Sequence, residues 1–67
     1  MAITLKAARV NRGYTQDAAA KIIGVTVDTI SNWERGKSFP NVPQLKKIEE
    51  AYGVTYNELI FLPNSNG

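Results

Sequence analysis

The sequence predicts an all-α fold, a compact domain of five short helices. Two segments, Asn41 to Gln44 and Thr55 to Glu58, have the capping-box pattern, in which the first and fourth residues bond each other's backbone and start a helix. Glycines follow the periodic stretches, where a helix often ends in a left-handed residue; they are Gly13, Gly24, Gly36 and Gly53. These signals leave only short connections, as is typical of compact helical domains.

The first two predicted helices cover residues 3–12 and 16–23. Leu5 and Ala8 share the inward face of the first helix, because they are three residues apart. The second helix follows Thr15, a residue type that favours the N-cap position. Its predicted inward residues are Ala19, Ala20 and Ile23.

The third predicted helix covers residues 27–35 and follows Thr26, another favourable N-cap. Its predicted inward residues are Ile30 and Trp33. Between the second and third helices, Gly24 can adopt the positive φ that a tight reversal requires, and the small Ala20 lets the two helices cross closely. This spacing is that of a helix-turn-helix, whose second helix can enter a DNA major groove with its outward face.

The fourth predicted helix covers residues 42–52, and the fifth covers residues 56–62 with Leu59 toward the core. The inward residues of the fourth recur at helical spacing; they are Leu45, Ile48 and Tyr52. The single domain is therefore assigned to residues 1–62. A polar tail, residues 63–67, is expected to be flexible.

The composition excludes several kinds of function. The chain has no Cys and no His, so disulfides, Cys/His zinc sites and His-based catalysis are ruled out. No paired acids are placed for acid–base work, which predicts that the chain is not an enzyme and uses no metal or cofactor. No apolar run approaches the ~20 residues that span a bilayer, and no signal peptide is recognised, so we expect no membrane partner.

The charge is unevenly distributed along the chain. All eight basic residues lie in residues 1–47 with three acids, a balance of +5, whereas the last twenty residues carry three acids and no base. This polarity favours a basic face toward phosphate and an acidic end turned elsewhere. On composition alone, ordinary surface charge remains an equal alternative.

The motif residues together resemble the lambda-repressor-like family (XRE family) of Cro-type and repressor-type DNA-binding domains. The residues that carry the resemblance are Arg9, Arg12-Gly13-Tyr14-Thr15-Gln16, Ala20, Gly24-Val25-Thr26, Ile30-Ser31, Trp33-Glu34-Arg35-Gly36-Lys37, Pro40, Leu45 and Ile48. The resemblance implies a five-helix domain, a dimer on a near-palindromic operator, and regulation of transcription. Two positions depart from the family pattern: Ala19 replaces a larger apolar residue, and Ile22 replaces a polar one. A small rotation of the second helix would let Ile22 compensate for Ala19.

The outward face of the third helix is predicted to read DNA bases. Asn32 can bond bidentately to adenine, Val27 or the Thr29 methyl can contact a thymine methyl, and Asp28 can accept from a cytosine amino group. An acid in the first helical turn is also stabilised by the helix dipole without DNA, so a structural role for Asp28 stays open. The full predicted base-reading set is Thr26, Val27, Asp28, Thr29, Ser31 and Asn32.

Other polar residues are predicted to bind the DNA backbone. The resemblance implies that Gln16 meets a phosphate at the start of the second helix, where free N–H groups suit an anion. For Arg12 and Lys6, plain surface charge is an open alternative. The predicted phosphate-binding set is Gln16, Arg35, Lys37, Ser38, Asn41 and Arg12. The resemblance also implies a partly buried structural ion pair between Arg9 and Glu34.

The fifth predicted helix has more apolar surface than one core face needs. We expect this surface to meet a second copy of the chain; its residues are Tyr56, Ile60, Phe61 and Leu62. Alternatively, Phe61 and Leu62 fold back under the first helix. A weak homodimer, stabilised on DNA, would place two recognition helices one DNA turn apart, about 34 Å.

These features predict a sequence-specific regulator of transcription that binds double-stranded DNA. Its simplest form is a Cro-like or repressor-like protein of a phage or mobile element, in the cytoplasm of a prokaryotic cell and at the nucleoid through its DNA. Alternatives are an antitoxin or restriction-system controller with a regulatory protein partner, or a protein-interaction module that does not bind DNA. The concentration of basic residues in the first 47 positions favours DNA binding over the interaction module.

Overall fold

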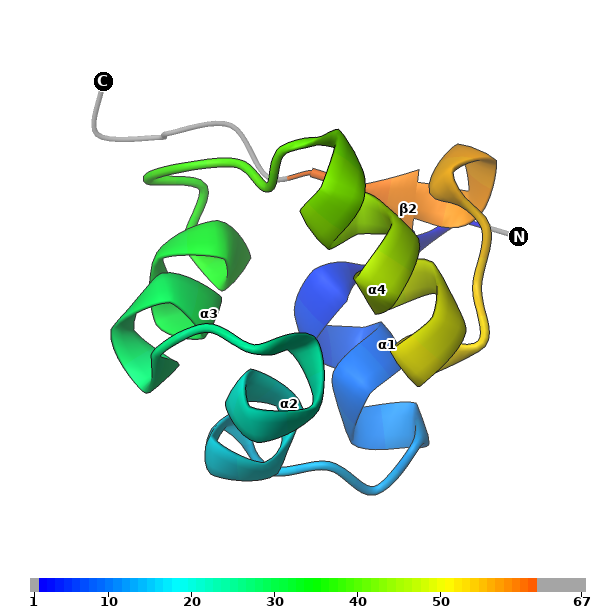
Figure 1. Cartoon of the computed structure of the whole chain (residues 1–67). Coiled ribbons are helices and arrows are strands. Elements are labelled where there is room, and N and C mark those ends of the chain that lie inside the picture. Colours follow the sequence, from blue (N-terminus) through cyan, green and yellow to red (C-terminus); the bar gives the residue numbers. More distant parts are fainter. Residues whose placement is uncertain (1, 62–67) are drawn as a thin grey trace.

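The computed structural model describes residues 2–61 (Figure 1). A small parallel sheet pairs the first and last segments of this range, and four helices lie between them in the sequence. The elements in order are β1 (Ile3–Thr4), α1 (Leu5–Asn11), α2 (Gln16–Ile23), α3 (Val27–Glu34), α4 (Val42–Tyr52), the 3₁₀ helix η1 (Tyr56–Glu58) and β2 (Leu59–Ile60). The predicted all-α, five-helix fold is confirmed only in part: the architecture is mostly helical, and the described residues form four α-helices rather than five. The predicted tail, residues 63–67, and Leu62 lie outside the described residues.

The middle helices have the bounds that their start signals predict, apart from α3, which ends one residue early at Glu34. The Thr15 hydroxyl accepts the Ala18 N–H at 3.1 Å at the start of α2. Asn41 and Gln44 form the capping box of α4, with both bonds at 2.9 Å. These side chains satisfy N–H groups that the first helical turn leaves unpaired.

Helix α1 starts later than predicted. Thr4 is its N-cap: the backbone is extended there (φ −75°, ψ 160°), and the hydroxyl accepts the Ala7 N–H at 3.1 Å. Because an N-cap residue has non-helical backbone angles, the helix cannot include Ile3. The first residues of the chain are therefore available for a strand.

The prediction of a fifth α-helix over residues 56–62 is wrong. The capping contact does form, since the Glu58 carboxylate accepts the Thr55 N–H at 2.9 Å, but the helix stops after one 3₁₀ turn. From Leu59 the backbone is extended, and β2 pairs in parallel with β1, Ile3 opposite Leu59. Strand pairing supplies the backbone hydrogen bonds that a fifth helix would have made internally. The fold is therefore mostly helical rather than all-α.

The core lies among the four α-helices and is closed by Leu59 of β2. Its buried apolar residues are Leu5, Ala8, Ala19, Ala20, Ile23, Ile30, Trp33, Ile48, Ala51, Tyr52 and Leu59. Ile22 is 51% exposed, so it does not fill the core in place of a larger residue at Ala19. Across residues 2–61, no helix has the length and apolar character needed to cross a membrane.

Candidate nucleic-acid interface

Helix α3 turns one side to the core and leaves the other at the surface, along the left edge of the molecule in Figure 1. Ile30 and Trp33 are almost completely buried on the inner side. Six predicted base-reading residues begin at the N-cap and follow the outer side. Of these, Thr26, Val27 and Asp28 are exposed, and Thr29, Ser31 and Asn32 are half-buried.

Two threonines of this set already have partners within the helix. Thr26 is the N-cap of α3, and its hydroxyl accepts the backbone N–H of Thr29 at 3.2 Å. The two hydroxyl oxygens are also 2.9 Å apart, so one donates to the other. Both hydroxyls therefore form hydrogen bonds at the N-terminal end of α3. The other polar side chains of the outer side are Asp28, Ser31 and Asn32.

The C-terminal end of α3 gathers three donor residues. An Arg35 amino group, Nη2, donates to Asn32 Oδ1 at 3.3 Å. Gly36 takes a positive φ of 75°, its N–H bonds the Trp33 carbonyl, and the Lys37 N–H bonds the Asn32 carbonyl. This double closure is a Schellman motif, which needs glycine because side chains disfavour that backbone region. It places Lys37 directly beyond the turn that carries Asn32 and Arg35.

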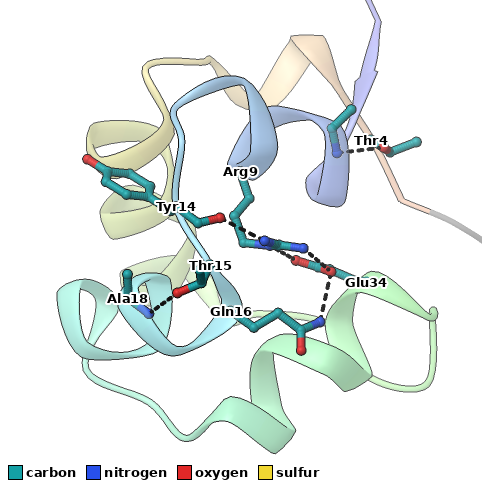
Figure 2. Close-up of polar contacts among 8 residues, drawn as sticks. Thr4, Arg9, Tyr14, Thr15, Gln16, Ala18 and Glu34 are labelled. Atoms are coloured by element: carbon teal, nitrogen blue, oxygen red, sulfur yellow. Dashed lines mark hydrogen bonds and ion pairs between the residues drawn. The ribbon is translucent and has the colours of Figure 1, made fainter.

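A buried polar network joins the start of α2 to the end of α3 (Figure 2). Arg9 donates through Nε to Glu34 Oε2 at 2.6 Å and through Nη2 to Oε1 at 3.2 Å. Its third bond, from Nη1 to the Tyr14 carbonyl, is 2.7 Å long. Gln16 Nε2 donates to the same Glu34 Oε1 at 3.1 Å. Three helices therefore meet at one carboxylate, and Arg9 also bonds the turn between α1 and α2.

Two groups in and beside the network have raised pKa values. The hydrogen bond to Glu34 raises the pKa of Arg9 above its ordinary value, against the opposing effect of burial. Tyr52 packs nearby with its ring 6.4 Å from that of Tyr14. Burial, together with the Glu34 charge, raises the pKa of Tyr52 to about 12, so it stays neutral. The bond from Gln16 was not foreseen, because sequence spacing alone does not show which side chain faces Glu34.

The remaining phosphate candidates fall into two groups. Lys37, Ser38 and Asn41 are exposed in the segment that follows α3. Asn41 Oδ1 accepts a backbone N–H of α4, so this side chain helps to start that helix. Arg12 lies elsewhere, with its guanidinium beside Gly53 at the C-terminal end of α4. Its Nη1 would be 3.4 Å from a Cβ placed on Gly53. In Figure 1 that end lies on the opposite side of the molecule from α3.

The predicted dimer residues lie around an aromatic cluster. Tyr56 and Ile60 are exposed, and the half-buried Phe61 packs against Tyr56 with ring centres 5.9 Å apart. Phe39, which the sequence did not single out, meets Phe61 edge-on at 6.1 Å and is 58% exposed. A hollow of about 350 Å³ lies among Phe39, Pro40, Leu45, Tyr56 and Phe61. We call this region the C-terminal apolar surface; it consists of the exposed Phe39, Val42, Tyr56 and Ile60 and the half-buried Phe61.

The paired α2 and α3, with the turn at Gly24 and the outward face of α3, define a helix-turn-helix domain. Residues 5–59 match the family model described as helix-turn-helix. The chain therefore belongs to the XRE-type, lambda-repressor-like helix-turn-helix family.

Three relatives illustrate the family, each matched over 56 residues or 84% of this chain. The HTH-type transcriptional activator BcrR of Enterococcus faecalis is 38% identical, and the HTH-type transcriptional regulator ImmR of Bacillus subtilis is 36% identical. An uncharacterized SPbeta prophage-derived regulator of B. subtilis, YonR, is 32% identical. The matched regions cover 28%, 44% and 52% of these relatives, so the chain spans about half or less of their lengths.

Proposed function

We propose that this chain is a sequence-specific regulator of transcription that binds double-stranded DNA with α3 in the major groove. The observation that carries the proposal is the bond between Gln16 and Glu34, which fixes the start of α2 against the end of α3. In the docking geometry of helix-turn-helix domains, the first helix meets the DNA backbone while the second meets the bases. The network holds the two helices ready for that task.

The charge and the surface chemistry support the same docking. Arg35 and Lys37 are exposed at the end of α3, where they can neutralise phosphates beside the groove. The outer side of α3 itself has short side chains, including Val27, Asp28 and Asn32. Affinity then comes mostly from the two cationic residues at the end of α3, because phosphate contacts carry no sequence information. Sequence preference comes from the short side chains on its outer side.

We also propose that two copies bind a near-palindromic operator as a weak homodimer that DNA stabilises. The C-terminal apolar surface supports this, since Phe39 is 58% and Val42 is 66% exposed. Contiguous exposed apolar side chains of this kind often mark an interface. Sedimentation at micromolar concentration should show monomer or weak dimer without DNA and full dimer on the operator. A tight tetramer in either condition would contradict the proposal.

The simplest biological setting is a Cro-like or repressor-like protein of a phage or mobile element, which occupies an operator and blocks polymerase. The prophage-derived name of YonR supports this setting, whereas BcrR is named an activator. A reporter gene behind the operator distinguishes repression from activation. We expect expression to fall when the protein is supplied, and a rise would show activation instead.

The binding test is a gel shift with duplex DNA from the promoter region beside the protein's own gene. We expect a specific complex that random DNA does not form and that weakens steeply as salt rises. Asn32→Ala and Gln16→Ala should both lose affinity. Asn57→Ala is the matched control, because Asn57 is an exposed amide in η1. Equal binding to random DNA, survival in ~1 M salt, or full affinity in both interface variants would refute the docking.

A further inference from the structure

Two side chains at the end of α3 are joined before any DNA is bound. Arg35 follows Asn32 by three residues, and its Nη2 donates to Asn32 Oδ1 at 3.3 Å. A guanidinium carries five N–H donors and no acceptor. The amide of Asn32 must therefore turn its oxygen toward Arg35, and its NH₂ group is directed to other partners.

This orientation changes which base Asn32 suits. An asparagine that reads adenine accepts from the N6 amino group through its oxygen and donates to N7 through its nitrogen. Here the oxygen already accepts from a cation, so a second donor from adenine meets both a shared acceptor and a nearby positive charge. Guanine instead presents two acceptors, N7 and O6, on its major-groove edge. The available N–H groups of both side chains match that edge.

The backbone turn that carries both side chains is well fixed. The Lys37 N–H bonds the Asn32 carbonyl at 2.9 Å, and the Gly36 N–H bonds the Trp33 carbonyl at 3.2 Å, so the turn that carries both side chains is closed twice. Within residues 2–61, the ion pair is between Arg9 and Glu34, and Arg35 has an amide partner rather than a carboxylate. Its charge is therefore not neutralised by a carboxylate.

We propose that Asn32 and Arg35 form a single hydrogen-bond donor unit that recognises guanine in the major groove. This inference rests on the proposed DNA-binding function and adds a base preference to it. It also moves Arg35 from the phosphate-binding set to the base-reading set. The outer side of α3 then has an acceptor at its start, Asp28, and donors at its end, which gives the helix a direction along the base sequence.

The experiment is selection of bound sequences from a random duplex library, followed by affinity measurements on the enriched site and its single-base variants. Wild type should enrich one guanine in each half-site. Replacing that guanine should weaken binding roughly 5- to 150-fold, the range for one good bidentate contact. Asn32→Ala and Arg35→Ala should each remove the preference, and the double variant should lose little more, because the two side chains act together.

Two further variants separate base reading from charge. Arg35→Lys keeps the positive charge but loses the planar fork, so it should retain general affinity and show a weaker guanine preference, because a lysine can still donate to guanine. Lys37→Ala is the matched control for a cation beside the unit, and it should weaken all sequences about equally without changing the selected base. Thermal unfolding of each variant shows whether the fold is kept.

The outcomes separate the guanine preference from DNA binding itself. An enriched adenine at this position, or an unchanged preference in Arg35→Ala with uniformly weaker binding, overturns the donor unit and returns Arg35 to a phosphate. If wild type enriches no sequence at all, the proposed function itself fails.

Discussion

Replacing Glu34 with alanine should remove much of the stability of this domain. Glu34 and Arg9 are only 9% and 7% exposed, and the carboxylate accepts two bonds from Arg9 and one from Gln16. Without it, the guanidinium stays buried with the Tyr14 carbonyl as its remaining partner. Breaking a buried ion pair by removing one partner costs about 3–5 kcal/mol, because the other charge is left uncompensated.

That loss is large for a chain of 67 residues. At about 0.05–0.15 kcal/mol per residue, its free energy of unfolding is roughly 3–10 kcal/mol. Glu34→Ala should therefore lower the midpoint of thermal unfolding by roughly 10 °C or more, since about 1 kcal/mol shifts a small domain by 4–8 °C. Trp33 is the single tryptophan and is buried beside Glu34, so its fluorescence during urea denaturation measures the free energy directly.

Two controls make this prediction specific to the buried pair. Glu50→Gln removes an exposed carboxylate from α4 and should change stability by less than about 0.5 kcal/mol. The double variant Arg9→Met/Glu34→Leu replaces the pair with apolar groups, and it should be more stable than Glu34→Ala because no charge is left buried. A cost below about 1 kcal/mol for Glu34→Ala, or a double variant that is no better, would refute the reasoning.

Three other predictions follow from single positions. Gly24→Ala should lower the free energy of unfolding, measured by urea denaturation, by about 1–2 kcal/mol, because Gly24 has φ +89°. The loss would come from backbone strain, since a Cβ there would meet only Lys47 Nζ at 3.8 Å. Gly24→Asn should cost less, and an alanine variant as stable as wild type would exclude strain. Stability should fall between pH 10 and about 12, because the pKa of Tyr52 is raised from 10.0 to about 12 in the folded state and the unfolded chain ionises first; the fall should be absent in Tyr52→Phe. Arg12→Ala should leave DNA affinity nearly unchanged in gel shifts while Arg35→Ala lowers it, and similar losses would place both residues at the DNA.

The central helices could be predicted because their signals are local. Thr15, Thr26 and Asn41 each accept a backbone N–H at the start of the helix that they were expected to cap. Apolar residues at helical spacing then fix which side of each helix is buried. The helix-turn-helix and the outward side of α3 follow from these two signals together.

The ends of the chain could not be predicted in the same way. Residues 56–62 have too few turns for an apolar period to distinguish a helix from a strand, and the capping contact of Thr55 and Glu58 suits a single 3₁₀ turn equally well. The strand at Leu59 depends on its partner at Ile3, which is remote in sequence. The bonds of Gln16 to Glu34 and of Arg35 to Asn32 were also missed, because they depend on side-chain directions that spacing does not specify.

The parallel pairing of β1 with β2 also bears on the order of folding. Ile3 stands opposite Leu59, so this contact closes a loop that contains all four helices. Such a long closure costs chain entropy before other contacts can offset it, so we expect the helices to associate before the sheet forms. During synthesis, Ile3 and Thr4 leave the ribosome long before their partners exist. We therefore expect the strand that begins the domain to be among the last parts to reach its native place.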